Sequence, residues 1–352
     1  MVKPKSVVLR FLSPRQWRPA GWILPLLCLL TFIFSWAAVY PSGLVERWYA
    51  RGIFPKISYV VGKFADSVPF SWLDVTIPAL GVLLIVLGRK QRWGILLKAA
   101  VGFYLFFFWT WGLNYHRKAL SSKLQLEATR MQPQAMTEFA RHAAAELNRL
   151  YSLSAERRNY PSDELETRAE AAQRVRRVVA IIDDRDWESA HRIKVSWVVN
   201  PWLRSAGVDG FFNPLGHEPV VSKTVLDIER PFVMSHELAH VRGYPDEGDA
   251  NVIATFATLM SGNPAFQYSG WLSLWLYLRT PELDKLLDPG PRQDVQRIFE
   301  RARIEQIRWV NDFQQALLDW FLKANSIDEG VRSYSRVVLL AAGTEPFWAR
   351  FR

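Results

Sequence analysis

Three long apolar runs in the first 115 residues constrain the fold of this chain more than any other feature. They cover about residues 20–40, 72–88 and 93–115. A run of roughly 20 apolar residues is long enough to cross a bilayer as a helix. The rest of the 352-residue chain mixes apolar and charged residues as a soluble protein does. We therefore expect a membrane domain over 1–117 with three transmembrane helices, followed by a second domain over 118–352.

The first apolar run has an alternative interpretation as a signal peptide, because basic residues precede it. Its length exceeds that of a cleaved apolar region, and two more runs follow, which favours an uncleaved anchor. The second run is shorter and carries Asp74 near its start. We interpret Asp74 as a boundary residue rather than a functional carboxylate inside the membrane.

Basic residues near the runs indicate the orientation, because short cytoplasmic flanks are enriched in Lys and Arg. They cluster before the first run and between the second and third runs: Lys3, Lys5, Arg10, Arg15, Arg18, Arg89, Lys90 and Arg92. This pattern predicts a multi-pass protein of the bacterial inner (plasma) membrane, with a cytoplasmic N-terminus and an extracytoplasmic C-terminal domain. The net charge of +10 is largely explained by these flanks. No basic stripe carries base-stacking aromatics, so we expect a lipid bilayer as partner and no nucleic acid.

The second domain is predicted to be mainly helical. Apolar residues recur every three or four positions over 119–182, and another long helix is expected over about Arg292 to Ala324. Pro231 begins a helix that reaches about Arg242, and Asp246 begins one that reaches about Ser261. Two stretches have strand character: Lys194 to Val199 and Glu218 to Lys223. The expected fold is mainly α, with an α+β second domain that contains a small sheet.

The string HELAH at 236–240 carries the chemistry. Residues four apart lie on one face of a helix, so His236 and His240 can present two imidazoles to one metal ion. Glu237 lies beside them, where it can act as the general base of a zinc peptidase. The only cysteine, Cys28, lies in the first apolar run, so any metal must be held by histidines and carboxylates. One Zn²⁺ per chain is expected; the alternative is a helix with two ordinary histidines.

The third metal ligand is expected among the acidic residues that follow Gly243. Glu247 is the first choice, with Asn251 four residues later placed to brace a ligand histidine. Asp249 is the second candidate. Acidic residues in the first turn of a helix also occur simply because they interact favourably with its dipole, which is the alternative interpretation.

Residues around Gly216 to Lys223 precede the HELAH helix and could form an edge strand that pairs with a substrate backbone. His217 and Glu218 could then contact substrate or metal, or simply form an exposed turn. Tyr244 and Tyr268 are candidate donors to the oxyanion of the reaction, although such tyrosines more often serve packing.

Several segments resemble a family of bacterial membrane proteins designated only as a domain of unknown function (DUF3810). They are WGLNYHR at 111–117, HELAH followed by Arg242-Gly243, Ala250-Asn251, Tyr268-Ser269-Gly270, and 321–338. The resemblance implies three membrane spans and an external zincin-like domain, described as a zinc peptidase. The family pattern Glu-Asp-Glu-Ala-Asn stands here as EGDAN at 247–251, which keeps Glu247 and replaces the next two acidic residues.

These patterns favour a membrane-anchored zinc metallopeptidase of the glutamate (gluzincin) type, acting on peptide or protein substrates close to the membrane. Two alternatives stay open. One is a zincin-fold binding or chaperone-like module without turnover, against which the intact Glu237 argues. The other is a zinc hydrolase of a non-peptide envelope amide, because the same activated water attacks many carbonyls. The sequence carries no indication of an oligomeric state.

Overall fold

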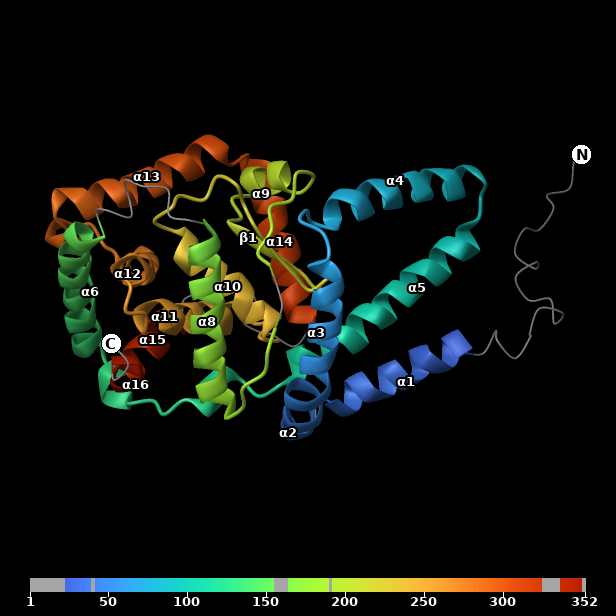
Figure 1. The fold of residues 1–352 in the computed structure, drawn as a ribbon, viewed down its shortest axis with the longest axis horizontal. Helices are drawn as coiled ribbons and strands as arrows, with labels where there is room; N and C mark the ends of the chain where they lie inside the picture. Colours follow the sequence, from blue (N-terminus) through green and yellow to red (C-terminus); the bar gives the residue numbers. More distant parts are fainter. Residues whose placement is uncertain (1–22, 39–41, 155–163, 190–191, 325–335, 350–352) are drawn as a thin grey trace, which may run out of the picture.

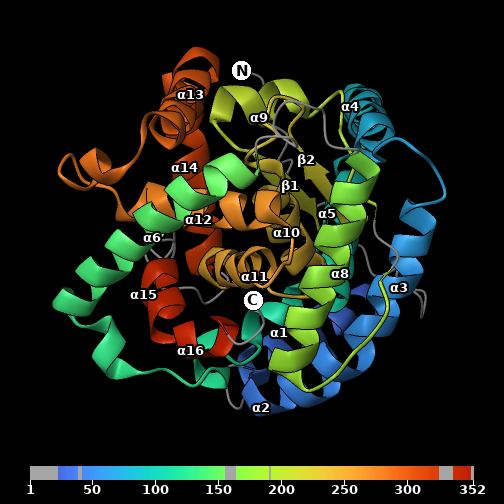
Figure 2. The same ribbon diagram turned by 60° about the vertical axis from the view of Figure 1, so that its left-hand side comes forward.

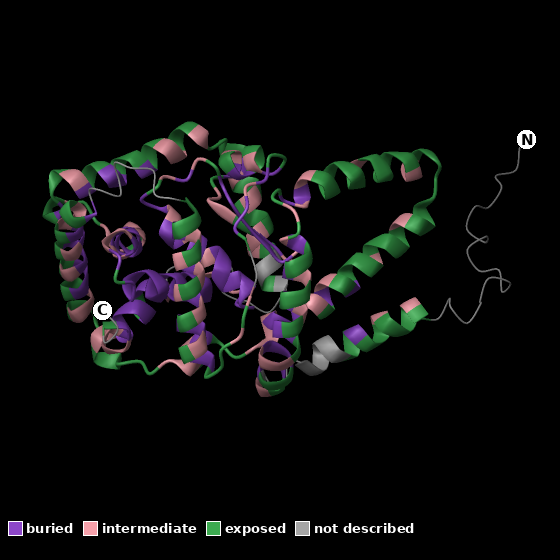
Figure 3. Cartoon of the chain, in the orientation of Figure 1, coloured by how far each residue is buried: buried purple, intermediate pink, exposed green. Residues whose placement is uncertain are grey.

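The structure, a computed structural model, has two visibly different parts. It describes residues 23–38, 42–154, 164–189, 192–324 and 336–349. Three helices project from one side of a helical body (Figure 1): α1 (Ile23–Ala38), α4 (Leu73–Arg89) and α5 (Trp93–Thr110). Their side chains are mostly exposed, whereas the buried residues concentrate in the body (Figure 3).

Among the described helices, α5 is the one long and apolar enough to cross a membrane, with 18 residues of which 11% are buried. The helix α4 is one residue shorter and contains Pro78, and α1 is apolar over Ile23–Ile33. The remaining ends of the first predicted span, 20–22 and 39–40, lie outside the described residues. The third predicted span ends five residues early, at Thr110, because Trp111 turns into the body and a 3₁₀ turn, η5 (Gly112–His116), follows.

The segment between α1 and α4, which lies between the first two predicted spans, is largely helical. It comprises α2 (Ser42–Leu44), the π-helix η4 (Val45–Ile53) and α3 (Phe54–Ala65). Tyr49 and Phe54 are buried in the same hydrophobic core as the body. Residues assigned to the membrane domain from the sequence are thus part of the packing of the body.

The body is built around two buried helices, α10 (Arg230–Val241) and α11 (Glu247–Leu259). In α11 every residue from Gly248 to Leu259 is buried, which requires neighbours on all sides. Figure 2 shows α10, α12 (Pro264–Leu278), α15 (Arg336–Gly343) and α8 (Glu164–Asp183) around it. The remaining elements of the body are η6 (Leu120–Lys123), η7 (Ala128–Met131), α6 (Pro133–Leu153), α9 (Asn200–Ala206), η8 (Leu283–Leu286), α13 (Pro289–Glu305), α14 (Arg308–Ala324) and α16 (Glu345–Trp348).

The predicted boundaries of α10 and α11 are confirmed to within two residues. The long helix predicted over 292–324 is instead two helices, because the chain turns at Gln306 and the amide of Ile307 donates to the carbonyl of Ser205 at 2.9 Å. The helical pattern predicted from 119 begins as the short 3₁₀ turns η6 and η7 before α6.

The described residues form one small sheet of two antiparallel strands, β1 (Gly210–Asn213) and β2 (Glu218–Val221). The second predicted strand is therefore confirmed over 218–221. The prediction of a strand over 194–199 is wrong apart from one parallel bridge between Lys194 and Val220, because residues 197–199 turn into α9. Since β2 is flanked by β1 and by Lys194, the outer edge of β1 is the edge that no other strand of the described residues pairs with.

Candidate metal centre

The helices α10 and α11 bring three metal-ligating side chains together. The Nε2 atoms of His236 and His240 are 3.1 Å apart. The Glu247 Oε2 atom lies 3.1 Å from Nε2 of His236 and 3.7 Å from Nε2 of His240. His236 and His240 come from successive turns of α10, and Glu247 is the first residue of α11, where Asp246 caps the helix by accepting from the amide of Asp249. The sequence prediction named these three residues as ligands.

The other ring nitrogens of both histidines are fixed by hydrogen bonds. Nδ1–H of His236 donates to Oδ1 of Asn251 at 2.8 Å, and Nδ1–H of His240 donates to the carbonyl oxygen of Tyr244 at 2.7 Å. A proton held on Nδ1 leaves the Nε2 lone pair of the neutral imidazole available. Both rings therefore present Nε2 to the space that they share with Glu247, and such supporting bonds are typical of metal-ligating histidines.

The three donor atoms fit a metal ion, and zinc in particular. Zinc bonds of about 2.0–2.1 Å at tetrahedral angles place neighbouring ligand atoms roughly 3.3 Å apart. The observed separations of 3.1, 3.1 and 3.7 Å approximate one face of that tetrahedron. Two nitrogens and one carboxylate oxygen also match the three protein ligands of catalytic zinc sites, whose fourth position is taken by water.

Charge is already balanced inside this group. Burial raises the pKa of Glu247, but the imidazoles of His240 and His236 outweigh that effect and hold its pKa well below the usual range. Burial lowers the pKa of His240, but the carboxylate of Glu247 outweighs it and raises the pKa to about 9. The metal-free group therefore carries a proton at neutral pH that a metal ion must displace, so its metal affinity should increase with pH.

Glu237 lies beside this group and is buried. Its Oε2 atom has no hydrogen-bond partner among the described residues. Desolvation is the main reason that its pKa is raised to about 7. An unsatisfied buried carboxylate is costly unless a ligand or solvent molecule completes it. Glu237 is thus poised to exchange a proton with a molecule bound next to the three ligands.

Gly210, on β1, defines the position of that carboxylate. A Cβ atom at residue 210 would lie 2.2 Å from Oε1 of Glu237 and 2.7 Å from its Cδ. Only glycine lets the strand approach this closely. The strand β1 therefore passes directly beside Glu237.

Asp249, the second candidate for the third ligand, is held elsewhere. Its Oδ2 atom accepts the amide of Leu120 at 3.1 Å, and Oδ1 accepts from Arg336 at 3.4 Å. Desolvation raises its pKa to about 7. Asp249 thus ties α11 to the segments on either side of it, and the structure groups Glu247 with the histidines.

His217 and Glu218 are both buried, so the prediction of an exposed turn is wrong. Glu218 accepts from Nζ of Lys194 at 2.8 Å and from the amide of Trp72 at 3.1 Å. His217 lies among the rings of Phe54, Trp111 and Phe212, and burial lowers its pKa to about 4. These side chains hold the base of α4 and the β1–β2 turn together. The strand next to Glu237 is β1 at 210–213 and not the predicted segment 216–223.

The two predicted oxyanion donors are also engaged elsewhere. The hydroxyl of Tyr244 donates to Asp183 at 2.7 Å, and that of Tyr268 donates to Asp294 at 2.7 Å. Both rings are buried. Tyr244 contributes to the candidate centre through its backbone carbonyl, which fixes His240.

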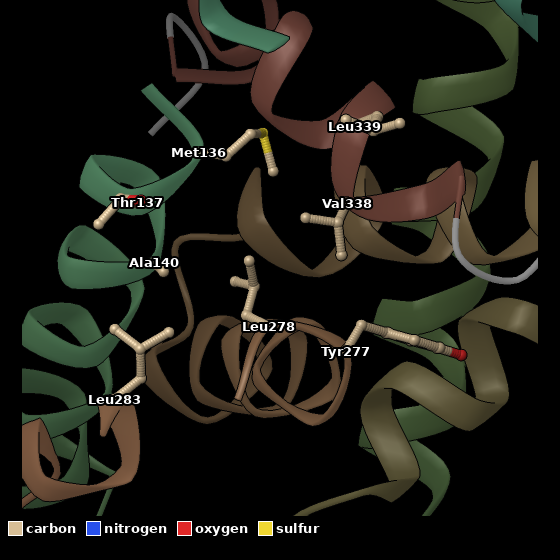
Figure 4. A pocket seen from close by; sticks show the side chains of 8 residues that line it. All are labelled: Met136, Thr137, Ala140, Tyr277, Leu278, Leu283, Val338 and Leu339. Carbon is tan, nitrogen blue, oxygen red and sulfur yellow. The ribbon is translucent and has the colours of Figure 1, made fainter. Parts of the chain in front are cut away.

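Tyr277 is a polar side chain near the site that the sequence did not single out. It borders an apolar cavity of about 390 Å³, and its hydroxyl points away from the other lining side chains (Figure 4). The cavity is lined by Met136, Thr137, Ala140, Tyr277, Leu278, Leu283, Val338 and Leu339. Desolvation and the carboxylates of Glu247 and Asp209 raise the pKa of Tyr277 to about 12. The hydroxyl therefore stays protonated at neutral pH, and its pKa responds to the charge of Glu247.

A second buried polar group, the junction cluster, comprises Glu46, Arg117, Lys123 and Asp183. Arg117 lies 3.0 Å from Glu46 and 3.0 Å from Asp183, and Lys123 contacts both carboxylates. Arg117 also donates to the carbonyl of Gly243 at 2.8 Å, and its guanidinium lies 4.0 Å from the centre of the Tyr244 ring. Because Tyr244 fixes His240, this cluster connects the segment after α5 to a candidate metal ligand.

Together, these features define a mainly helical protein in which two histidines and a glutamate form a group that can hold a metal ion. Residues 49–342 match the model of a family described as a protein of unknown function (DUF3810), so the chain belongs to this family. The family resemblance inferred from the sequence is thereby confirmed. No curated protein matches the chain. No solved structure matches it either.

Proposed function

We propose that this protein is a membrane-anchored zinc peptidase of the glutamate type. The observation that carries the proposal is the grouping of two Nε2 atoms and one carboxylate oxygen at 3.1–3.7 Å, directly beside a buried carboxylate. His236, His240 and Glu247 would hold one zinc ion. When bound, zinc would polarise a water molecule and lower its pKa.

Glu237 is the general base in this proposal. With a pKa of about 7 it can accept a proton from water and later return it to the leaving amine. The outer edge of β1 would pair with the substrate backbone beside Glu237, as in strand addition to a sheet edge. Tyr277 supplies a protonated hydroxyl that can donate to the developing oxyanion.

The proposal includes three membrane-spanning helices, α1, α4 and α5, in a bacterial inner membrane. Their projection from one side of the body supports this arrangement (Figure 1). The chain would cross with its N-terminus in the cytoplasm and its body outside. Trp111, at the end of α5, packs 4.5 Å from the ring of Phe212, which lies 6.1 Å from the ring of His240. The site would therefore lie near the membrane surface, which favours membrane-proximal peptides or proteins as substrates.

The zinc content of the detergent-purified protein tests this proposal first. We expect about one zinc per chain in the wild type and almost none in His236→Ala. Glu247→Ala should lower zinc affinity more than tenfold, since even the loss of a supporting residue costs about 10–100-fold. A wild-type protein that takes up no zinc after reconstitution would overturn the proposal.

Turnover separates a peptidase from the two alternative functions. Glu237→Gln should keep zinc. It should abolish the cleavage of a quenched peptide library by the protein reconstituted into liposomes. A zinc-loaded wild type that binds these peptides without cleaving them would indicate a binding module. A wild type that cleaves only amides of cell-wall material would indicate the non-peptide hydrolase.

A further inference from the structure

The helix α14 (Arg308–Ala324) exposes an apolar face that the proposed chemistry does not use. Trp309, Phe313, Leu317 and Trp320 recur every three or four residues, so they share one face. Their exposed fractions are 72%, 59%, 45% and 66%. A monomer in water rarely leaves such a continuous apolar stripe uncovered.

The other faces of α14 are already accounted for. Val310 is buried, and the amide side chain of Asn311 donates to the carbonyl of Ala206 at 2.7 Å, which attaches the helix to the end of α9. Asp312, Gln315 and Asp319 lie on a different, polar face. The helix thus has a packed face, a polar face and an exposed apolar face.

The position of α14 indicates what covers the apolar face. Figure 1 places α14 at the edge of the body from which α1, α4 and α5 project, with its axis across their direction. On the same side, η4 exposes Trp48, and α3 exposes Val60 and Phe64. Tryptophan at the boundary between apolar spans and a polar domain is typical of the membrane interface.

We infer that α14 lies in the plane of the membrane surface and docks its apolar face into the lipid. This inference rests on the membrane anchoring in the proposed function. A helix of this kind, with an apolar face and a polar face, buries its apolar side about 5–10 Å into the boundary between headgroups and acyl chains. Lipid is the occupant that fits, because it must already surround the apolar α5 on that side of the body. Docking would hold β1 and the metal ligands at a fixed height above the bilayer.

Site-directed spin labelling of the full chain tests this docking. Cys28→Ala removes the only native cysteine, and single cysteines then replace Phe313 on the apolar face or Gln315 on the polar face of α14. Leu97→Cys on α5, where the native side chain is 67% exposed, is the reference for lipid contact. Each labelled protein is reconstituted into vesicles of phosphatidylcholine and phosphatidylglycerol, and the accessibility of each label to oxygen and to water-soluble chromium oxalate is measured.

We expect the label at 313 to lie about 5–10 Å below the phosphates and the label at 315 to lie in water. Equal exposure of both labels to chromium oxalate would overturn the docking. A label at 313 that is shielded from both reagents would also overturn it, because protein rather than lipid would then cover the face. A label at 97 that is also in water would show that the anchoring itself fails. The zinc content of the same samples reports separately on the metal site.

Discussion

The candidate metal centre and the junction cluster are both buried and polar, but they differ in how completely their atoms are paired. In the junction cluster two carboxylates face two cations, and among the described residues none of its buried side-chain oxygen or nitrogen atoms lacks a partner. In the metal centre, Glu237 keeps an unpaired oxygen, and two imidazole nitrogens face each other at 3.1 Å. The first arrangement is complete and holds structure; the second has the unpaired oxygen that a bound molecule would satisfy in the proposed function.

The largest effect is expected from breaking the complete cluster. Arg117→Met keeps the apolar stem but leaves the buried carboxylates of Glu46 and Asp183 with Lys123 as their one shared cation, besides the partly exposed Arg51 that lies 3.2 Å from Glu46. Removing one partner of a buried ion pair costs about 3–5 kcal/mol of unfolding free energy. Denaturant unfolding of the protein in detergent, followed by tryptophan fluorescence, measures this loss.

Arg149→Met is the matched control for that substitution. Arg149 pairs with Glu146 at 2.8 Å, but its side chain is half exposed, so the same change should cost less than about 1 kcal/mol. Equal losses from both variants would mean that burial gives Arg117 no special role.

Lowering the pH should disrupt the junction cluster because it protonates the carboxylate of Glu46. Burial raises the pKa of Glu46, but Arg117 and Lys123 outweigh it and lower the pKa from 4.5 to about 2. The carboxylate therefore contributes stability that is fully present above about pH 4.5 and is lost as the pH falls towards 2. A shift of this size corresponds to about 3 kcal/mol.

The pH dependence of the unfolding free energy, compared between the wild type and Glu46→Gln, tests that contribution. The wild type should lose stability steeply between pH 5 and about pH 2, and the variant should show a shallower slope. Parallel curves would contradict the assignment of the acid sensitivity to Glu46.

In the metal centre, a small displacement of Glu237 should change turnover rather than the stability of the fold. Gly210→Ala places a methyl group 2.2 Å from the Glu237 carboxylate, which must then move. Because displacements of about 1 Å can cost a catalytic site about 100-fold, we expect turnover to fall by about 10–100-fold with zinc content unchanged. Peptide cleavage and elemental analysis measure the two quantities.

Gly262→Ala is the control, because no atom lies within 4 Å of a Cβ at that position. It should match the wild type in turnover and in zinc content. If Gly210→Ala is as active as this control, turnover does not require the position that β1 imposes on Glu237.

The same comparison shows what the sequence could predict. The metal group depends on residues 4 and 11 positions apart on two successive helices. Helical spacing was enough to place His236 and His240 together, and the pattern from Glu247 to Asn251 after the helix break indicated Glu247, with Asp249 as second candidate. The junction cluster joins residues 60–77 positions apart, and no local pattern reports such pairs.

The individual sequence predictions that were wrong have the same origin: they depended on contacts between residues that are far apart in the sequence. The sequence pattern suggests that Glu218 is exposed. The side chain is buried because Lys194 and the turn before α4 pack against it. The strand β1 contains only four residues, two of them Phe211 and Phe212, and the close approach of Gly210 to Glu237 depends on tertiary packing. The spacing around Tyr244 and Tyr268 did not indicate that Asp183 and Asp294 would accept their hydroxyls.

The smallest effect is expected from substitutions at Asn251 and Asp249, two residues of α11 whose side chains accept hydrogen bonds near the site. Asn251→Ala removes the oxygen that fixes Nδ1 of His236, so the ring loses its preferred tautomer and orientation. Loss of such a supporting bond lowers metal affinity by about 10–100-fold, and we expect the lower end because Glu247 and His240 are unchanged. Competition for zinc with a fluorescent chelator measures the change.

Asp249→Asn is the control for Asn251→Ala, because it changes a neighbouring side chain that bonds to Leu120 and Arg336. Zinc affinity should stay close to the wild-type value in this variant. If Asp249→Asn weakens zinc binding as much as Asn251→Ala does, the third ligand is Asp249 or the two residues act together. A selective effect of Asn251→Ala would instead show that the orientation of His236, and not the general packing of α11, limits metal affinity.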